Sequence, residues 1–544
     1  MINYTEEQKE AIKPQGSLVI TACPGSGKTA VIAEKIRNEL VDLKSYQGVI
    51  AITFTRKASK ELEGRCRANG ADTKCSFFGT IDSFCLSEII YPFLNQVYDG
   101  STENLEPKYL ADLTTAEKLI AAQLNEVDKV EAKELELIRK LYFNGTIYFP
   151  TIPALAMYVH ENCEACKTYI KAKYTSIYID EYQDSSKAQH SLFLNIVDSG
   201  LTGIAVGDLQ QSIYGWRRCS PEYLKELIRR HNFTHRTVSY NHRCHASISN
   251  YSNRLFNPQF ELTPTDSIQI WQCQFTGTQR DAAIHLNTII PLLLDKNKTA
   301  KASDIAVLVR NNRSLGYLRD HLTIPCRIFA DDAIDELQSR TGSLWSALLK
   351  YRFDISMTPD QVIEVLPDQS NMSKAKLIDT RRVIRKARSA DQYLLEDYLT
   401  SASKKLLNID PKESELAALK LVASDNDALK QYITTSTNEI QCMTIHKAKG
   451  LEFEIVIHLD LNEWIFPYRE MGERFADKLY PSWEQDLNLH FVGVTRAKTM
   501  CLLVHTTLRL NAKDETKGGD PSAFLRLPGV QNLYKTYSLS LIHI

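Results

Sequence analysis

The sequence contains no run close to the about 18 continuous apolar residues that a membrane-spanning helix needs, which excludes a membrane span. Its first residues, MINYTEEQKEAI, are polar and lack the apolar stretch of a signal peptide. An excess of either charge is also missing, because 65 Lys and Arg residues face 66 Asp and Glu residues. Any nucleic acid must therefore meet basic residues that gather locally, since a net charge of −1 supplies no long-range attraction.

Cysteine is not regularly spaced, and the 12 cysteines give no sign of a disulfide framework. Cys163 and Cys166 form a single Cys-x-x-Cys pair, and Cys244 lies between Arg243 and His245. A zinc or iron–sulfur site requires four converging ligands at suitable spacing, which neither stretch provides. We therefore expect free thiols and buried cysteines in a reducing compartment, and we expect the protein to be cytoplasmic.

One absent signature narrows the class of enzyme. P-loop ATPases of the transport and chromosome-organising type carry a Leu-Ser-Gly-Gly-Gln signature, and this chain has none. The chain of 544 residues is also too long for a single hydrophobic core. At about 150 residues per domain, its length suggests three or four domains.

Residues 18–31, LVITACPGSGKTAV, indicate a buried strand, a phosphate loop and the start of a helix that reaches about Leu40. Small residues allow backbone N–H groups to surround phosphate oxygens at the positive end of the helix dipole. We predict an ATP site in which Lys28 contacts the β- and γ-phosphates and Thr29 binds Mg²⁺. The predicted nucleotide contacts here are Ala22, Cys23, Pro24, Gly25, Ser26, Gly27, Lys28, Thr29 and Ala30. Ala22 stands where the generic pattern begins with Gly.

Strands and helices alternate around this loop. Residues 49–54 (VIAITF) are continuously apolar, which is typical of a strand in a parallel sheet, and an amphipathic helix follows to about Arg67. Another strand is predicted at residues 76–79. The order predicts an α/β fold with a doubly wound sheet, in which ligands bind beyond the carboxyl ends of the strands.

A pair of carboxylates marks the end of a further buried strand. Residues 176–179 (SIYI) lead into Asp180 and Glu181, which begin the run DEYQD. In a chain with a phosphate loop, Asp180 can hold Mg²⁺ and Glu181 can polarise the attacking water. An isolated acidic pair would more often cap a strand, but this pair accompanies a phosphate loop.

Further motifs occur in a recognisable order. They are Gln8, residues 53–55 (TFT), the DEYQ run, residues 207–217 (GDLQQSIYGWR), 443–453 (MTIHKAKGLEF) and 492–497 (VGVTRA). On these motifs, which span nearly the whole chain, the sequence resembles the UvrD-like superfamily 1 helicases. The resemblance implies an ATP- and Mg²⁺-dependent DNA helicase of 3′-to-5′ polarity. It also implies two RecA-like P-loop motor domains, each interrupted by a mainly helical inserted subdomain.

The resemblance assigns roles to individual residues. Gln211 couples the γ-phosphate to DNA, Arg243 and Arg496 are arginine fingers, Gln8 reads adenine, and Glu452 lies near the ribose. The implied DNA contacts are Phe54, Tyr214, Trp216, Arg217 and His446. Fixed cations supplied from a second domain would make hydrolysis depend on domain closure. The implied ligands are single-stranded DNA and junctions of single- and double-stranded DNA.

Three longer segments are similar to the helicase subunit of the Gabija anti-phage systems. They are residues 77–93 (FFGTIDSFCLSEIIYPF), 173–193 (KYTSIYIDEYQDSSKAQHSLF) and 242–256 (HRCHASISNYSNRLF). This similarity implies a separate nuclease subunit that carries an ATPase-like domain and a Toprim domain. The oligomeric state of the chain alone stays open.

Three positions depart from the family pattern. His242 stands where relatives often have Tyr stacked on adenine, and Ala30 stands where they often have Arg, so discrimination among nucleoside triphosphates is open. Asp82 replaces a common His in a motif that contacts DNA. Little chain remains after Arg496, so we expect no fused nuclease domain, and the last residues, SLSLIHI, are not explained.

The periodicity gives an expected domain division. The first motor comprises residues 1–85 and 168–256 with a helical insertion at 86–167, and the second comprises 257–333 and 438–537 with an insertion at 334–437. In that second insertion one helical stripe carries Lys374, Arg381, Arg385 and Arg388, which indicates either a duplex-binding face or a solvated surface. Both insertions are short, which favours a second hypothesis: a DNA-end sensor that hydrolyses ATP and regulates a partner nuclease with little unwinding.

Overall fold

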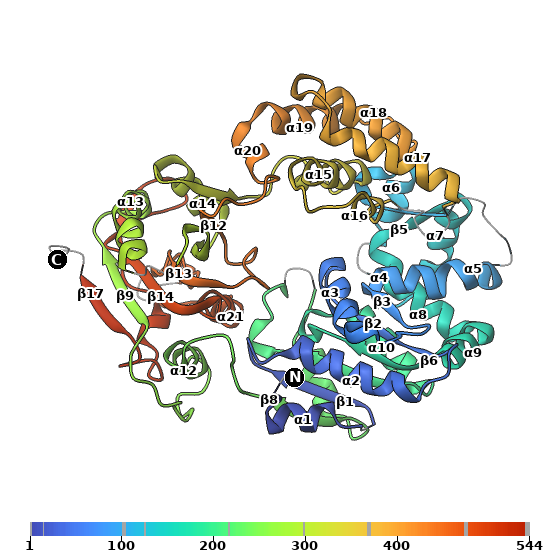
Figure 1. Ribbon diagram of the computed structural model, residues 1–544, viewed down its shortest axis with the longest axis horizontal. Coiled ribbons are helices and arrows are strands. Elements are labelled where there is room, and N and C mark those ends of the chain that lie inside the picture. The colour runs from blue at the N-terminus through green and yellow to red at the C-terminus, as the bar shows by residue number, and fades with distance from the viewer. Residues whose placement is uncertain are drawn as a thin grey trace. The chain divides into compact units, whose positions relative to one another are not determined.

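The computed structural model describes residues 3–14, 16–98, 100, 105–124, 127–215, 218–296, 300–366, 372–472 and 477–538. The chain divides into two compact units (Figure 1). The first unit comprises Met1–Leu209, Tyr214–Tyr240 and Ala333–Ser424, and the second comprises Gln210–Ile213, Asn241–Asp332 and Asp425–Ile544. Within the described residues, no helix has both the length and the apolar composition required to cross a membrane.

A parallel sheet with the strand order β3-β2-β6-β7-β1-β8 forms the centre of the first unit. Its strands are β1 (Leu18–Ala22), β2 (Gly48–Ile52), β3 (Phe77–Gly79), β6 (Tyr174–Ile179), β7 (Thr202–Gly207) and β8 (Thr234–Val238). Strands β1, β2, β6 and β7 are apolar and nearly fully buried because helices cover both faces of the sheet.

Side chains alternate between the two faces of this sheet. Leu18 and Ile20 belong to the core formed with α1 (Glu6–Ile12), α2 (Lys28–Asp42) and α3 (Arg56–Cys66). Val19 belongs to the opposite core, to which helices α8, α10 and α11 contribute. The bounds of these helices are α8 (Ile152–Asn162), α10 (Lys187–Asp198) and α11 (Glu222–Arg229). A sheet covered in this way brings the carboxyl ends of its strands to one edge.

Two mainly helical regions complete the first unit (Figure 1). The first has the helices α4 (Ile81–Phe84), α5 (Tyr91–Tyr98), α6 (Thr115–Ala121), α7 (Ala132–Phe143) and α9 (Glu164–Lys173), and a parallel strand pair, β4 (Glu106–Lys108) and β5 (Thr146–Tyr148). The second has α15 (Arg340–Phe353), α16 (Pro359–Ile363), α17 (Lys374–Arg385), α18 (Leu395–Leu407) and α19 (Glu413–Ser424). Ile152, Leu155 and Val159 of α8 are fully buried in the core that the first region shares with the sheet.

Ion pairs join the two helical regions to each other and to the sheet-bearing core. Arg340 Nη1 donates to Glu106 Oε2 at 2.5 Å, and its backbone N–H donates to Asp112 Oδ1 at 3.2 Å. Glu364 pairs with Lys60 of α3 and accepts from Arg56 through its carbonyl oxygen. The region from 333 to 424 therefore packs with the first unit, although in the sequence it interrupts the strands of the second.

The second unit has its own parallel sheet, with the strand order β11-β12-β10-β13-β14-β9-β17. The strands are β9 (Ile270–Phe275), β10 (Ile305–Val309), β11 (Cys326–Phe329), β12 (Ile440–Thr444), β13 (Phe453–His458), β14 (Ala497–Thr506) and β17 (Lys535–Ser538). The helices include α12 (Ala246–Arg254), α13 (Gln279–Lys296), α14 (Asn312–His321), α20 (Asn426–Lys430) and α21 (Trp483–Val494), and β15 (Leu508–Leu510) pairs with β16 (Thr516–Gly518). The two parallel sheets confirm the predicted α/β class with two RecA-like motor domains.

Candidate active site

Left-handed glycines shape the loop between β1 and α2. Gly25 has a φ of +70° and Gly27 a φ of +77°. A Cβ added to Gly27 would lie 3.0 Å from Gln8 Nε2, so this position lacks both the conformation and the space for a side chain. The backbone N–H of Ser26 donates to the carbonyl oxygen of Cys23 at 3.3 Å, which closes the turn.

The amino terminus of α2 fits an anionic group. Gly27 caps the helix without a side-chain hydrogen bond, and the first turn holds no acidic residue. Ser26 Oγ is buried and has no hydrogen-bond partner among the described residues. Lys28 Nζ lies 3.5 Å from the carbonyl oxygen of Ala22, at the base of the loop. Phosphate oxygens would supply acceptors for these N–H groups, for the hydroxyl and for the ammonium group.

Gln8 lies directly against this loop. Thr5 and Gln8 form a reciprocal capping box at the start of α1. The same Gln8 side chain also contacts the loop, because its Nε2 donates to the carbonyl oxygen of Ser26 at 2.9 Å. The buried amide therefore holds the loop backbone, and its cap bond fixes its orientation.

Asp180 and Glu181 follow β6, and β7 lies between β6 and β1. Two inter-strand steps of about 4.8 Å separate the carboxyl ends of β6 and β1, a distance that a hydrated Mg²⁺ and phosphates can span. Thr29 and Asp180 are the candidate ligands for that ion. Glu181 has the left-handed angles φ 55° and ψ 40°, an uncommon conformation for a residue other than glycine.

Gln183 links Glu181 to the neighbouring strand. Its Nε2 donates to Glu181 Oε2 at 2.5 Å, and its Oε1 accepts from the backbone N–H of Asp208 at 2.9 Å. A Cβ added to Gly207 would lie 2.6 Å from Gln183 Oε1, so only glycine allows this approach. The proposed water-polarising carboxylate is thus tied to the strand that leads to Gln211.

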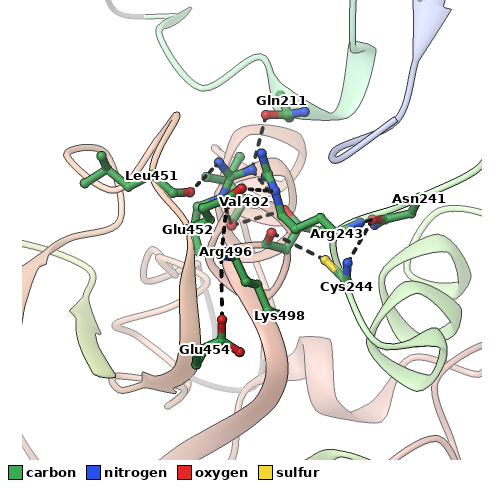
Figure 2. Close-up of polar contacts among 11 residues, drawn as sticks. Gln211, Asn241, Arg243, Cys244, Leu451, Glu452, Glu454, Val492, Arg496 and Lys498 are labelled. Atoms are coloured by element: carbon green, nitrogen blue, oxygen red, sulfur yellow. Dashed lines mark hydrogen bonds and ion pairs between the residues drawn. The ribbon is translucent and has the colours of Figure 1, made fainter. Parts of the chain in front are cut away.

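The second unit contains the other predicted catalytic residues: Gln211, Arg243, Glu452 and Arg496. Figure 2 shows the polar contacts among these side chains and their neighbours. Arg496 is almost completely buried, and its Nε donates to the carbonyl oxygen of Val492 at 3.1 Å. Its Nη1 donates to the carbonyl oxygen of Leu451 at 3.1 Å, and its Nη2 donates to Gln211 Oε1 at 3.4 Å. These bonds fix the plane of the guanidinium group.

Gln211 belongs to this unit although both flanking stretches belong to the first. Lys449 Nζ donates to the carbonyl oxygen of Gln211 at 2.8 Å. The amide of Asn488 donates to the carbonyl oxygen of Ser212 at 3.0 Å. The segment that follows β7 is therefore held by residues of the motifs at 443–453 and by α21.

Arg243 forms an ion pair with Glu452. The distance between Arg243 Nε and Glu452 Oε2 is 2.7 Å, and Lys498 Nζ lies 3.0 Å from the other carboxylate oxygen (Figure 2). Partial burial raises the pKa of the Glu452 carboxyl group, but Lys498 and Arg243 outweigh it and leave that pKa below its ordinary value. Glu452 therefore stays ionised near neutral pH and can hold Arg243.

The peptide that carries Arg243 is fastened at several points. Asn241 Oδ1 accepts from the backbone N–H groups of Arg243 and Cys244 at 2.8 and 3.0 Å. The backbone N–H of His245 donates to the carbonyl oxygen of Lys498 at 2.7 Å, and Cys244 Sγ lies 3.7 Å from that of Thr495. The segments that contain Arg243 and Arg496 are thus hydrogen-bonded to each other.

The structure brings together two of the predicted DNA-contacting residues. The rings of Phe54 and Tyr214, both in the first unit, stack with centroids 5.6 Å apart and an angle of 6° between their planes. Phe54 is 43% exposed, so the stacked pair is accessible from solvent. His446 follows β12 in the second unit, and Trp216 and Arg217 lie outside the described residues.

The departures from the family pattern have structural contexts. Asp82 lies in α4, and burial raises the pKa of its carboxyl group to about 6, partly opposed by Arg56. Ala30 is in the first turn of α2, whereas His242 precedes Arg243 in the second unit. These two predicted neighbours of the nucleotide base therefore belong to different units.

The basic stripe of the second helical region is partly used within the protein. Arg381 Nη2 lies 2.8 Å from Asp360 Oδ1. Arg388 lies over the ring of Tyr351, 4.1 Å from its centroid, and donates to the carbonyl oxygen of Met357 at 2.7 Å. Lys374 and Arg385 are exposed. Two of the four cations are therefore engaged within the protein, and a duplex-binding role for the stripe stays a prediction.

Each cysteine in the described structure is a free thiol. Cys163 Sγ contacts Gln96 Oε1 at 3.3 Å, and Cys166 is buried. Among the described residues there is no group of three or more His, Cys, Asp or Glu side chains that is arranged to hold a metal ion.

Sequence reasoning missed three residues of the site: Asn241, Lys449 and Lys498. Lys449 lies inside the motif that contains His446 and Glu452, so the motif could have indicated it. Asn241 and Lys498 lie next to the arginine motifs, but only the folded structure reveals that they hold those segments.

Comparison with protein families gives two matches. Residues 8–217 match the family described as an AAA domain, and residues 361–507 match the UvrD-like helicase C-terminal domain. The first match contains the phosphate loop, Asp180, Glu181 and Gln211, and the second contains Glu452 and Arg496.

Relatives align over nearly the whole chain. Gabija protein GajB of Bacillus cereus is 28% identical over 509 residues, which cover 91% of this chain and 94% of that protein. ATP-dependent DNA helicase PcrA of Staphylococcus epidermidis is 23% identical over 647 aligned positions, covering 96% of this chain and 86% of that protein. PcrA of Staphylococcus aureus is 24% identical, with 96% and 85% covered. In its matched domains, its parallel sheets and the order of its motifs, the chain is similar to the UvrD-like helicases.

Proposed function

We propose that this protein is an ATP-driven, 3′-to-5′ DNA translocase or helicase of the UvrD type. The observation that carries the proposal is the hydrogen bond between Gln211 and Arg496 in a chain that also contains a phosphate loop. Gln211 continues the peptide of β7, whose end is bonded to Gln183 and through it to Glu181. Only Leu209 and Gln210 separate Asp208, which Gln183 holds, from Gln211 along the chain.

The nucleotide would be held by the loop Ala22–Ala30, with Lys28 on its β- and γ-phosphates. Thr29 and Asp180 would hold Mg²⁺, which when bound neutralises charge on the phosphate oxygens. Glu181 would polarise the attacking water, while Arg243 and Arg496 would stabilise charge that develops on the transferred phosphoryl group. Gln8 would contact adenine and Glu452 the ribose.

DNA would lie on the stacked pair Phe54 and Tyr214, with Trp216, Arg217 and His446 as further contacts. Stacking on aromatic rings tolerates any base, as movement along a strand requires. Binding and hydrolysis of ATP would change the relation between two motor domains, one built on the parallel sheet of the first unit and one on that of the second. Single strands and junctions with duplex DNA are the proposed ligands.

The relative named Gabija protein GajB supports a proposal about partners. We expect a separate nuclease subunit with an ATPase-like and a Toprim domain, and a role in defence against phage in the cytoplasm. In an alternative function, the chain senses DNA ends and its ATP hydrolysis regulates that nuclease with little unwinding.

Steady-state ATP hydrolysis with and without single-stranded DNA tests the proposal. Hydrolysis should rise sharply with DNA and disappear in Lys28→Ala and Glu181→Ala, whereas the exposed control Arg382→Ala should behave as wild type. An ATPase that is indifferent to DNA contradicts a translocase.

A tailed duplex separates the two functions. If the protein alone, or together with its nuclease, displaces the strand with ATP, the helicase proposal holds. If neither unwinds and ATP hydrolysis changes only the cutting by the nuclease, the sensor function is the correct one.

A further inference from the structure

Ser239, the first residue after β8, has hydrogen bonds at each of its polar atoms. Its backbone N–H donates to Glu7 Oε2 at 2.7 Å, and its Oγ donates to Glu7 Oε1 at 2.8 Å and to Oε2 at 2.9 Å. Its carbonyl oxygen accepts from Cys23 Sγ at 3.0 Å. Ser239 is exposed in a connecting segment, yet protein groups rather than water alone bind its polar atoms.

Both partners of Ser239 belong to elements of the proposed nucleotide site. Cys23 is in the phosphate loop, and its backbone N–H donates to the carbonyl oxygen of Val238 at 3.1 Å. This bond extends the pairing of β1 with β8 beyond Ala22 and Val238. Glu7 is in the first turn of α1, beside Gln8, which holds the loop at Ser26. A shift of the loop or of α1 must therefore act on Ser239.

The chain that follows Ser239 leads directly to an arginine. Tyr240 is the last residue of this stretch of the first unit, and Asn241 is the first of the second. Asn241 in turn holds the backbone N–H of Arg243. Only three residues, Tyr240, Asn241 and His242, separate Ser239 from Arg243. The backbone conformation at Ser239 therefore limits the positions that Arg243 can reach.

We infer that Ser239 is a positioning residue that transmits the state of the phosphate loop to the segment carrying Arg243; this rests on the proposed function. The Glu7 carboxylate fixes two donors of one residue, which restricts the backbone dihedral angles there. Without the hydrogen bonds to Glu7, the backbone at Ser239 samples more conformations. The conformation that aligns Arg243 is then less populated. The loss should lower kcat while the affinity for ATP, which depends on the loop, is retained.

The test compares Glu7→Ala, which removes both acceptors, with Ser239→Ala, which removes one donor. Glu6→Ala is the matched control, because Glu6 lies in the same helical turn but pairs with Lys9. Ser239→Thr keeps the hydroxyl group and should restore the wild-type rate. We expect kcat to fall about tenfold in Glu7→Ala and less in Ser239→Ala, with KM for ATP within about threefold of wild type. The double variant should be no slower than Glu7→Ala.

A raised KM for ATP with unchanged kcat in Glu7→Ala would overturn the inference, because Glu7 would then contribute only to nucleotide binding. Wild-type kinetics in both alanine variants would overturn it as well. The measurement is made with and without single-stranded DNA. A wild-type protein that ignores DNA contradicts the proposed function, whereas the split between kcat and KM in basal hydrolysis still decides the role of Ser239.

Discussion

Gln211 Oε1 accepts a hydrogen bond from Arg496 Nη2 at 3.4 Å, and both residues belong to the second unit. The sequence surrounding Gln211 nevertheless continues from β7 of the first sheet. A residue expected to sense the γ-phosphate is therefore bonded to an expected arginine finger. This contact would let the two residues act together on one phosphate.

The first prediction concerns this pair. Arg496→Lys should lower kcat by about 10³-fold or more, since an ammonium cannot reproduce the fork of donors on a transferring phosphoryl group. Gln211→Ala should reduce the stimulation by DNA while ATP still binds. Steady-state kinetics and binding of a fluorescent ATP analogue measure both effects. If Gln211→Ala responds to DNA as wild type does, Gln211 is not the coupling residue.

The second prediction concerns the stacked rings. Phe54→Ala and Tyr214→Ala should each weaken binding of oligo-dT by about 1–3 kcal/mol, because a base loses an aromatic platform. Fluorescence anisotropy measures the dissociation constant. Tyr46→Ala is a suitable control, since Tyr46 is an exposed aromatic outside the predicted DNA contacts. Equal affinity in Phe54→Ala, Tyr214→Ala and the control would show that DNA does not bind at the stack.

The third prediction uses the partly buried carboxyl group of Asp82. Burial raises its pKa from an ordinary value of 3.8 to about 6, so at pH 7.5 the folded protein holds an unfavourable charge. As the pH falls through 6, the folded state takes up a proton that the unfolded chain takes up only near 3.8. The unfavourable charge on Asp82 is then neutralised, and its contribution to the free energy of unfolding is no longer destabilising.

Asp82→Asn should therefore raise the thermal midpoint at pH 7.5, and the gain should shrink by pH 5. Differential scanning fluorimetry across this range measures the effect, with the exposed Asp266→Asn as control. A gain that is the same at both pH values would contradict a raised pKa at Asp82.

The fourth prediction concerns a buried histidine pair in the second unit. His490 Nδ1 lies 3.1 Å from His458 Nε2, and the Tyr251 hydroxyl lies 3.1 Å from His490 Nε2. Burial lowers the pKa of His458 to about 4 and that of His490 well below its ordinary value. Both rings are neutral in the folded protein at pH 7.

The unfolded chain takes up protons at these histidines below about pH 6.5, whereas His458 in the folded chain does so only near 4. The free energy of unfolding should therefore fall as the pH drops from 6.5 to 4, by on the order of 3 kcal/mol for His458. Urea unfolding at several pH values measures this slope. His490→Gln should reduce the dependence of the free energy of unfolding on pH, whereas the exposed His231→Gln should not. Equal slopes in wild type and both variants would contradict a lowered pKa in this histidine pair.

Buried strands can be predicted from this sequence, whereas the polar edge strands β8 and β17 cannot. The run IAVLV predicts β10 with the observed bounds, because every residue of a central parallel strand is apolar. β8 (THRTV) and β17 (KTYS) lie at sheet edges and carry polar side chains, which leave no apolar signal. Pairing with β14 and β17 fixes β9 at Ile270–Phe275.

The chemistry of the site is local in sequence, but its assembly is not. The motifs predict which residues surround phosphate because loop, strand end and carboxylates are continuous stretches. No motif indicates that residues 333–424 pack with the first unit, since this depends on pairs such as Arg340 with Glu106. The same holds for the contacts of Gln211 and of Ser239, whose partners are more than 200 residues distant in the chain.

Displacement of streptavidin from biotinylated single strands tests the central claim most directly, because it requires movement along DNA and not only hydrolysis. With ATP and Mg²⁺, the protein should release streptavidin from an oligonucleotide with biotin at the 5′ end much faster than from one with biotin at the 3′ end. Lys28→Ala should release neither. Release that is equally slow from both ends, with and without ATP, would contradict a DNA translocase.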